Sequence, residues 1–231
     1  MDWYALKVED LKKQSFPRTN SGSVKFKIQF DPDDVVSGYA EMDVSRYDDC
    51  DGALAWLRWL REFEHLRELK DWGNRPNVCH NALKILLTGE TRVEYLTLVG
   101  DQLKITNEMI DNALFQITKT SVFYGDDPSL SLRHLLETMV KPKQMPVMDF
   151  HLAFKELLSF MPIVARGGTS PIAKPSYSSQ DIYELFANSL PDRWTTEFKR
   201  TGRPQTVKHL LQYCQVMEGT EARKKAFKQK F

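Results

Sequence analysis

Histidine and cysteine are the residues that most often perform chemistry, and in this 231-residue chain they lie far apart. The chain contains His65, His80, His134, His151 and His209, together with Cys50, Cys79 and Cys214. Only Cys79 and His80 are adjacent, and neighbouring residues on a helix point about 100° apart. The two side chains therefore do not form a thiol–imidazole dyad with each other. We expect Cys79 to be a small core residue beside a histidine on a polar face.

Other arrangements that support catalysis or ligand binding are not found in the sequence. It contains no glycine-rich phosphate-binding motif, no HExxH zinc motif and no GxSxG nucleophile motif. The acidic residues between Asp31 and Asp51 do not follow the alternating spacing of a calcium-binding loop. We therefore predict no catalytic residue, cofactor-binding residue or metal ligand. The chain is expected not to be an enzyme and to need no cofactor or small-molecule substrate.

Charge is distributed unevenly along the chain, although the net charge is only +1. The segment 31–51 holds eight acidic residues and one basic residue, whereas 199–231 holds nine basic residues and two acidic ones. Opposite charges at opposite ends favour head-to-tail contacts between copies, or binding of a polyanion at the basic end. The alternative is that both segments are simply solvated faces. The candidate nucleic-acid contacts are Arg223, Lys224, Lys225, Lys228 and Lys230. These residues also suit a helix end, where cations offset the helix dipole.

The sequence predicts a cytoplasmic location. Three cysteines without a CxxC pair are typical of a reducing compartment. No run approaches the roughly 20 apolar residues of a membrane span. The first residues, Met1 to Tyr4, lack the basic and apolar regions of a signal peptide.

Alternation with a period of two residues predicts a strand early in the chain. Apolar residues alternate with polar ones from Val24 to Phe30, and Tyr39 to Val44 is a candidate second strand. Residues 1–23 carry few periodic apolar positions and are expected to be a flexible arm. We therefore expect a short N-terminal strand or hairpin.

Helical periodicity dominates the remainder of the chain. From Leu54 to Leu69 it predicts an amphipathic helix capped by Asp49 or Asp51, with Trp56 and Trp59 in the core rather than stacked on bases. Further helices are expected to start at Pro76, near Val93, after Thr106, at Pro128, near Phe150, at Ser178 or Ser179, near Trp194 and near Val207. Pro162 is expected to end the helix that contains Phe150, before a Gly-, Pro- and Ser-rich loop at 163–178.

The clearest interruption of these helices is the segment from Gly125 to Pro128. It predicts a mainly α protein with two helical lobes. The expected parts are a flexible arm at 1–23, an N-terminal lobe with the strand or hairpin at 24–125, a C-terminal lobe at 126–220, and a basic tail at 221–231.

Five segments occur in an order that matches a known family. They are 82–95, 110–123, 146–158, 186–191 and 206–218. Together they resemble the capsid region of gypsy-type retrotransposon Gag proteins, over residues 53–220. The segment from Pro146 to Leu158 is similar to the major homology region of such capsids. Its homology-region-like core is Pro146, Val147, Asp149, Phe150, Phe154 and Leu158.

The sequence also departs from the family pattern. The Gln, Glu and Arg positions of the major homology region fall on Lys141, Met145 and Ala153, so its hydrogen-bond network is not expected here. Thr91 and Tyr95 replace the alanine and tryptophan that usually follow the glycine of the first segment. The zinc knuckle that follows the capsid in such proteins is not found in this chain.

The resemblance implies a structural Gag capsid protein that self-assembles into virus-like particles around element RNA. It implies homo-oligomers, with dimers of the C-terminal lobe, rings of the N-terminal lobe, and RNA contacts through the basic tail. Trp194 and Phe198 are the candidate oligomer contacts, and burial in the core is the alternative. Two other functions stay open. One is a domesticated Gag-derived adaptor that binds host proteins, and the other is a nucleoprotein that uses the basic C-terminal end.

Overall fold

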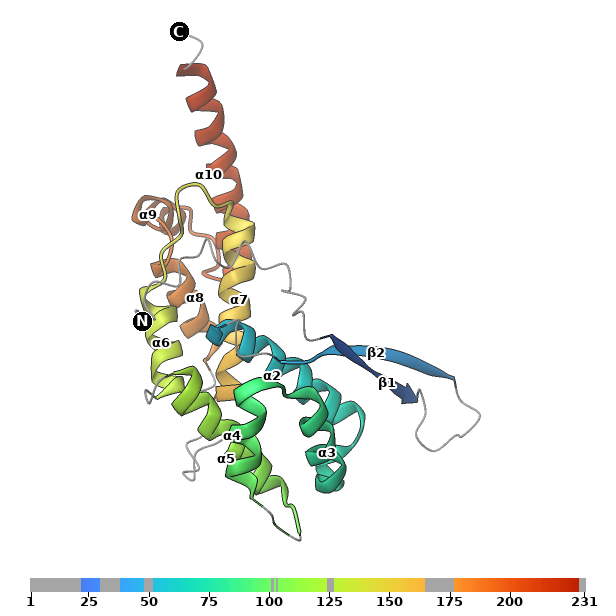
Figure 1. The fold of residues 1–231 in the computed structure, drawn as a ribbon. Coiled ribbons are helices and arrows are strands. Elements are labelled where there is room, and N and C mark those ends of the chain that lie inside the picture. The colour runs from blue at the N-terminus through green and yellow to red at the C-terminus, as the bar shows by residue number, and fades with distance from the viewer. Residues whose placement is uncertain are drawn as a thin grey trace. The chain divides into compact units, whose positions relative to one another are not determined.

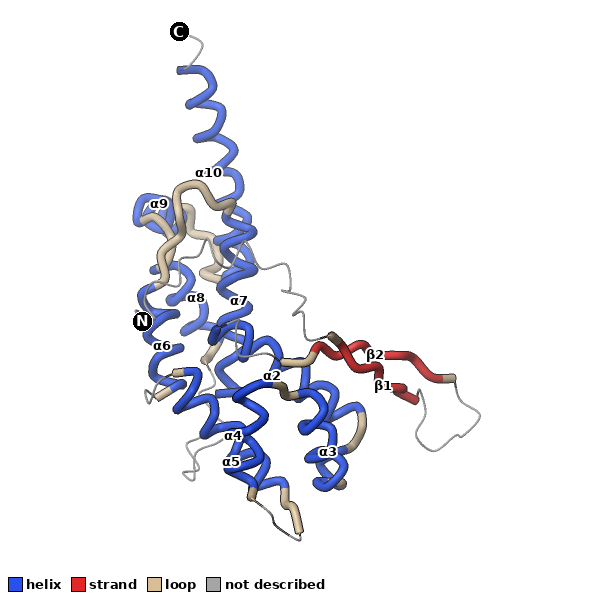
Figure 2. The backbone as a smooth tube through the Cα atoms, in the orientation of Figure 1, coloured by secondary structure: helices blue, strands red, loops and turns tan. Residues whose placement is uncertain are grey.

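The computed structural model describes residues 22–29, 38–47, 52–100, 102, 104–123, 127–164 and 177–228. Over these residues the protein is mainly helical, with a two-stranded antiparallel hairpin near the N-terminus (Figure 1; Figure 2). The described residues contain nine α-helices, α2 to α10. The prediction of a mainly α fold with an N-terminal hairpin is confirmed. The predicted arm lies outside the described residues except for Gly22 and Ser23.

The chain groups into two compact units. The N-terminal unit contains the described residues up to Pro128 together with 162–164, and the C-terminal unit contains Ser129–Met161 together with 177–228. The elements of the N-terminal unit are β1 (Ser23–Gln29), β2 (Tyr39–Ser45), α2 (Gly52–Leu69), the 3-10 turn η2 (Trp72–Asn74), α3 (Pro76–Leu86), α4 (Gly89–Val99), α5 (Asn107–Ile117) and the π-helical turn η3 (Thr118–Val122).

The hairpin forms where the sequence alternates. β1 pairs with β2 in antiparallel register, with Val24 opposite Val44 and Phe26 opposite Met42. These apolar side chains share one face because successive residues of a strand point to opposite sides. The ring of Phe26 meets the ring of Trp72 edge-on at 5.6 Å between centroids. This contact ties the apolar face of the hairpin to the turn that follows α2.

An aromatic stack on α2 forms the core of the N-terminal unit. Trp56 and Trp59 stack at 5.3 Å between centroids, and Trp59 stacks on Phe63 at 5.5 Å. The Trp56 indole Nε1–H donates to the hydroxyl of Thr118 over 2.8 Å, and that hydroxyl donates to the carbonyl of Leu114 over 2.7 Å. The two tryptophans are therefore core residues, as the helical spacing predicts.

Local signals mark the starts of two helices in this unit. Pro76 occupies the first turn of α3, where a missing N–H costs nothing. The Thr106 hydroxyl accepts from the Met109 N–H at the start of α5 over 3.3 Å. Both predictions are confirmed. The caps expected for α2, Asp49 and Asp51, lie outside the described residues.

The C-terminal unit is built from helices alone in its described part. They are α6 (Pro128–Thr138, of which all but the first residue belong to this unit), α7 (Val147–Val164, of which 147–161 belong to it), α8 (Ser179–Asn188), α9 (Asp192–Arg200) and α10 (Val207–Lys228). Phe150 and Phe154 of α7 pack against Phe186 of α8, with centroids 6.2 and 5.3 Å apart. All three rings are buried.

Two helices extend further than the sequence predicts. Helix α7 continues through Pro162 and ends at Val164. Proline removes one hydrogen bond to the preceding turn, but its fixed φ is helical, so a residue close to the helix end is tolerated. Helix α10 continues to Lys228, so most of the predicted basic tail is helical. The segment after Glu218 is rich in Glu, Ala, Arg and Lys, which are strong helix formers.

Candidate functional site

A buried lysine lies at the centre of the C-terminal unit. Lys141 follows α6, and its backbone N–H donates to the Ser189 carbonyl over 2.7 Å. Only 4% of its side chain is exposed. Burial of an ammonium group costs free energy unless the group is paired and hydrogen-bonded. The partners of Lys141 are therefore important for the stability of this unit.

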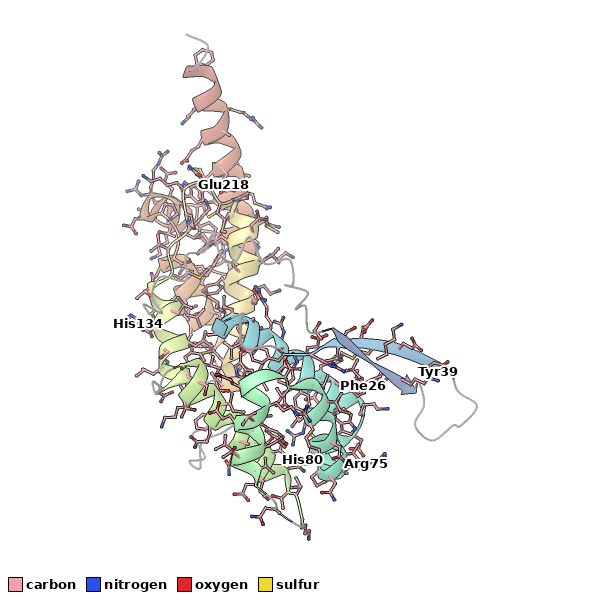
Figure 3. All side chains as sticks on the ribbon, viewed as in Figure 1. Phe26, Tyr39, Arg75, His80, His134 and Glu218 are labelled. Atoms are coloured by element: carbon pink, nitrogen blue, oxygen red, sulfur yellow. The ribbon has the colours of Figure 1, made fainter. Side chains whose placement is uncertain are left out.

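Glu218 is the charged partner of this lysine. Figure 3 labels Glu218 on α10. The Lys141 Nζ atom lies 2.9 Å from the Glu218 Oε1 atom. Both carboxylate oxygens also accept from the Val147 N–H at the start of α7, at 3.0 Å each. A carboxylate at a helix N-terminus is favoured by the helix dipole and satisfies an N–H that has no partner inside the helix. Glu218 therefore caps α7 from a distant part of the chain.

Trp194 of α9 completes what we call the Lys141 cluster, formed by Lys141, Val147, Trp194, Glu218 and Glu221. The Lys141 Nζ atom lies 5.2 Å from the centre of a Trp194 ring, within the range of a cation–π contact. The Trp194 indole Nε1–H donates to the Glu221 Oε1 atom over 3.0 Å. The Lys141 cluster thus links the starts of α7 and α9 to the middle of α10.

The two described cysteines are buried thiols. Burial raises the pKa of Cys79 to about 12, and it also raises the pKa of Cys214 to about 12. Such thiols stay protonated near neutral pH and are poor nucleophiles. The His80 Nδ1 atom lies 3.0 Å from the Tyr95 hydroxyl. Burial, and then Lys84, lower the pKa of His80. Cys79 is therefore the core residue that the sequence predicts.

Metal clusters and membrane-spanning helices are both absent from the described residues. No group of three His, Cys, Asp or Glu side chains in this part of the chain is arranged to hold a metal ion. None of the described helices is both long enough and apolar enough to cross a membrane.

The homology-region-like core occupies the start and middle of α7. Val147, Phe150 and Phe154 are buried, and Leu158 is half-buried. Pro146 is exposed immediately before the helix. Asp149 is exposed in the first turn, where its charge suits the helix dipole.

Trp194 and Phe198 lie in the core of the C-terminal unit. Trp194 is 4% exposed and Phe198 is fully buried. Trp194 packs in the Lys141 cluster, and Phe198 meets the ring of Tyr213 at 5.6 Å between centroids. This placement matches the alternative of core burial, so these two rings are not used in the oligomer surfaces proposed below.

The candidate nucleic-acid contacts lie at the end of α10. Arg223 and Lys224 are exposed on the helix. Lys225 and Lys228 belong to the helix, but only their backbone is described. Lys230 lies outside the described residues.

Sequence reasoning does not find the Lys141 cluster, although it singles out three of the members, Lys141, Val147 and Trp194. In the sequence Lys141 is only a departure from the family pattern, and Trp194 is only a candidate contact. The one available signal is a glutamate late in the closing helix, within the resembling segment 206–218. Because Lys141 and Glu218 are far apart in sequence, no local pattern connects them.

Comparison of the chain with models of protein families, with curated proteins and with solved structures finds no match. The candidate function is therefore argued from the geometry of the chain itself. Each polar member of the Lys141 cluster contacts another member, and the charged pair lies beside helix ends. This arrangement is suited to fixing helices in place.

Proposed function

We propose that this protein is a structural subunit of the Gag capsid type, which self-assembles into particles that enclose RNA. One observation carries the proposal. The homology-region-like segment forms the start of α7, and this start is held by Glu218 of the closing helix through the Val147 N–H. The start of the segment is thus fixed to the closing helix of its unit.

The internal rigidity of this unit supports an assembly function. A shell requires each copy to present the same surface, so the helices of the subunit must keep a fixed geometry. The Lys141–Glu218 ion pair fixes α10 against the start of α7, and the indole of Trp194 adds α9. We propose two lobes, at 24–125 and 126–220, as the units that make the contacts between copies.

Exposed apolar side chains on both units supply surfaces for such contacts. In the N-terminal unit, Ile85 is 51% exposed and Val93 is 65% exposed. In the C-terminal unit, Val140 is 67% exposed and Leu152 is 61% exposed. Contacts between copies remove apolar surface from water, and this burial favours association. The proposed arrangement has rings of N-terminal lobes and two-fold contacts of C-terminal lobes.

The basic end of α10 supports RNA as the enclosed molecule. Arg223 and Lys224 are exposed there, where cations bind phosphates without reading sequence. We place this assembly in the cytoplasm. The adaptor and nucleoprotein functions are the rival proposals, and the experiment below tests whether the protein assembles.

Electron microscopy and sedimentation velocity of the purified protein, over a range of concentration and salt, test the proposal. We expect particles or discrete oligomers, and we expect Leu152→Glu to weaken association because it places a charge on an apolar surface. Lys155→Gln, which makes the same change of −1 in charge at an exposed position of the same helix, is the matched control. A strictly monomeric protein under all conditions contradicts assembly. A pull-down that recovers defined host proteins, with a protein that forms no particles, would favour the adaptor.

A further inference from the structure

The hairpin of the N-terminal unit has two outer edges, and the hydrogen-bond pattern identifies the groups on them. The Arg46 N–H donates to the Gly22 carbonyl over 3.0 Å, so these opposed residues form a hydrogen-bonded pair. Antiparallel pairs alternate between bonded and non-bonded. The backbone N–H and C=O groups of every second residue therefore point outward. The outward residues are Ser23, Lys25, Lys27 and Gln29 on β1, and Tyr39, Glu41, Asp43 and Ser45 on β2.

Two side-chain hydrogen bonds agree with this assignment. The Trp59 indole Nε1–H donates to the Ser45 carbonyl over 2.9 Å, and the Lys70 ammonium donates to the Lys27 carbonyl over 2.8 Å. The first bond occupies an outward carbonyl of β2 only at Ser45, the end of the strand next to α2. The second is an exposed bond from a flexible side chain, which a competing strand can displace.

From Tyr39 to Asp43 the outer edge of β2 has no neighbouring strand among the described residues. β2 pairs only with β1 there, and the hairpin projects from the helices of its unit (Figure 1). Tyr39, Glu41 and Asp43 are exposed along this edge. An unpaired edge is a template for another strand.

Charge separates the two edges of the hairpin. Lys25 and Lys27 stand on β1, and Glu41 and Asp43 stand on β2, all on the exposed polar face. Within the hairpin they face one another, as Lys25 with Asp43 and Lys27 with Glu41. The Lys25 Nζ atom also lies 3.4 Å from the Glu41 Oε2 atom. One edge is therefore cationic and the other anionic.

We propose that a second copy of this chain binds this edge, with β1 of one copy pairing antiparallel with β2 of the next. The proposal rests on the self-assembly proposed above and names the surface that it uses. Pairing of β2 with β2, or of β1 with β1, would set like charges opposite each other, which destabilises a sheet. Pairing of β1 with β2 instead repeats the lysine-to-carboxylate contacts found within one hairpin.

This contact is head-to-tail, because the two copies contribute different edges. Head-to-tail contacts close into rings or continue as open filaments, and they never stop at a dimer. After each addition the growing assembly still presents one free β2 edge and one free β1 edge. Since the charged side chains are exposed, salt should weaken the contact.

Charge reversal of one edge at a time tests the proposal. Lys25→Glu with Lys27→Glu makes both edges anionic, and Glu41→Lys with Asp43→Lys makes both cationic. Each double variant should associate about tenfold more weakly than the natural protein in sedimentation velocity. An equimolar mixture of the two should associate again, because their edges are complementary. The variant with all four substitutions should associate alone.

Circular dichroism of each variant shows whether its helices remain folded, and slow exchange of the inward amide of Met42 shows whether its hairpin does. Double variants that associate as tightly as the natural protein overturn the proposal, and so does a folded mixture that fails to associate. If particles persist unchanged in these variants, the hairpin contact is refuted while the proposed assembly function stands. If the natural protein is monomeric throughout, both are refuted.

Hydrogen exchange of the natural protein provides a test that needs no substitution. The amides of Glu41 and Asp43 point outward in a single copy and should exchange rapidly. In the assembled state we expect their exchange to slow by about tenfold or more, since strand pairing buries them. The inward amide of Met42 is the internal control. Unchanged exchange at Glu41 and Asp43 on assembly overturns the proposal.

Discussion

Lys141 is a buried ammonium group with partners on α10 and α9. Its carboxylate partner, Glu218, at the same time accepts the Val147 N–H. Removal of one member of a buried pair leaves the other charge uncompensated, which costs far more than the net contribution of the pair. The pair therefore makes the C-terminal unit sensitive to single substitutions.

We predict that Glu218→Ala lowers the free energy of unfolding by about 3–5 kcal/mol, because it leaves the buried ammonium of Lys141 without its charged partner. Urea denaturation followed by circular dichroism measures the change. Lys141→Met should also destabilise the protein, and the double variant Lys141→Met with Glu218→Ala should be destabilised by less than the sum of the two single changes.

The exposed pair of Arg193 and Glu197 is the matched control for this cycle. Its Nε and Oε1 atoms lie 3.0 Å apart on α9, and both side chains are more than a third exposed. Removing Glu197 should have a much smaller effect, because exposed ion pairs contribute little. Equal destabilisation at the buried and exposed pairs, or additive effects for Lys141 and Glu218, would contradict a buried coupled pair.

The sequence identifies residues whose partners are close along the chain. It does not identify residues whose partners are far away along the chain. Thr106 bonds to Met109, three residues away, so its role is written in a short stretch of sequence. Glu218 bonds to Val147, 71 residues away, and Trp56 bonds to Thr118, 62 residues away. Only folding brings such partners together. The apolar part of the homology-region-like core is recognisable from sequence, whereas the hydrogen bond from the Val147 N–H to Glu218 is not.

At the scale of elements, α8 shows how one local signal defines a helix start. The Ser178 hydroxyl accepts from the Asp181 N–H over 3.1 Å, and the Asp181 carboxylate accepts from the Ser178 N–H over 2.8 Å. This capping box satisfies two N–H groups that have no partner inside the helix. Hydrogen bonds from Ser178 lower the pKa of Asp181 below its ordinary value.

We predict that Ser178→Ala lowers the free energy of unfolding by about 1 kcal/mol, the usual cost of removing an N-cap. Folding lowers the pKa of Asp181, so its ionised carboxylate stabilises the folded protein. This contribution to the free energy of unfolding is complete above the ordinary aspartate pKa of 3.8, and it is lost as pH falls through the lowered pKa. Urea denaturation as a function of pH measures both effects. The variant should show a weaker acid dependence in this window.

Ser179→Ala is the control for the capping box. Ser179 is the first helical residue and is exposed, and the capping bonds come from Ser178 instead. Destabilisation at Ser179 equal to that at Ser178 would argue against the box. So would a Ser178 variant with an unchanged acid dependence.

Other element boundaries show where local rules fall short. Pro162 indicates a helix end, yet α7 continues for two further residues because one missing hydrogen bond near a terminus costs little. The basic run after Glu218 indicates a tail on charge alone, although its residues favour a helix. Charge pattern is thus a poor guide to where a helix stops.

At the scale of the whole molecule, periodicity is enough to predict the mainly α class and the hairpin. It works because burial of one face fixes the spacing of apolar residues in both strands and helices. It says nothing of which exposed surfaces meet other molecules. Those surfaces depend on charge and on unpaired edges, which become visible only when strands such as β1 and β2 are set in register.

The basic end of α10 is the second such surface, and its function is tested through salt dependence. We predict that Arg223→Gln with Lys224→Gln weakens binding of single-stranded RNA. It should also reduce the slope of log affinity against log salt by roughly 1.4, at about 0.7 for each phosphate that is no longer neutralised. Fluorescence anisotropy over a salt series measures this slope.

Lys199→Gln with Arg200→Gln is the matched control for the basic end, because it removes the same charge from exposed positions in the last turn of α9. If RNA contacts α10 specifically, this variant keeps the natural slope. If both variants reduce the slope equally, attraction comes from net charge rather than from α10. Particles that form normally without RNA in the α10 variant would separate cargo binding from assembly, since the hairpin edges that we propose to join copies carry none of these four residues.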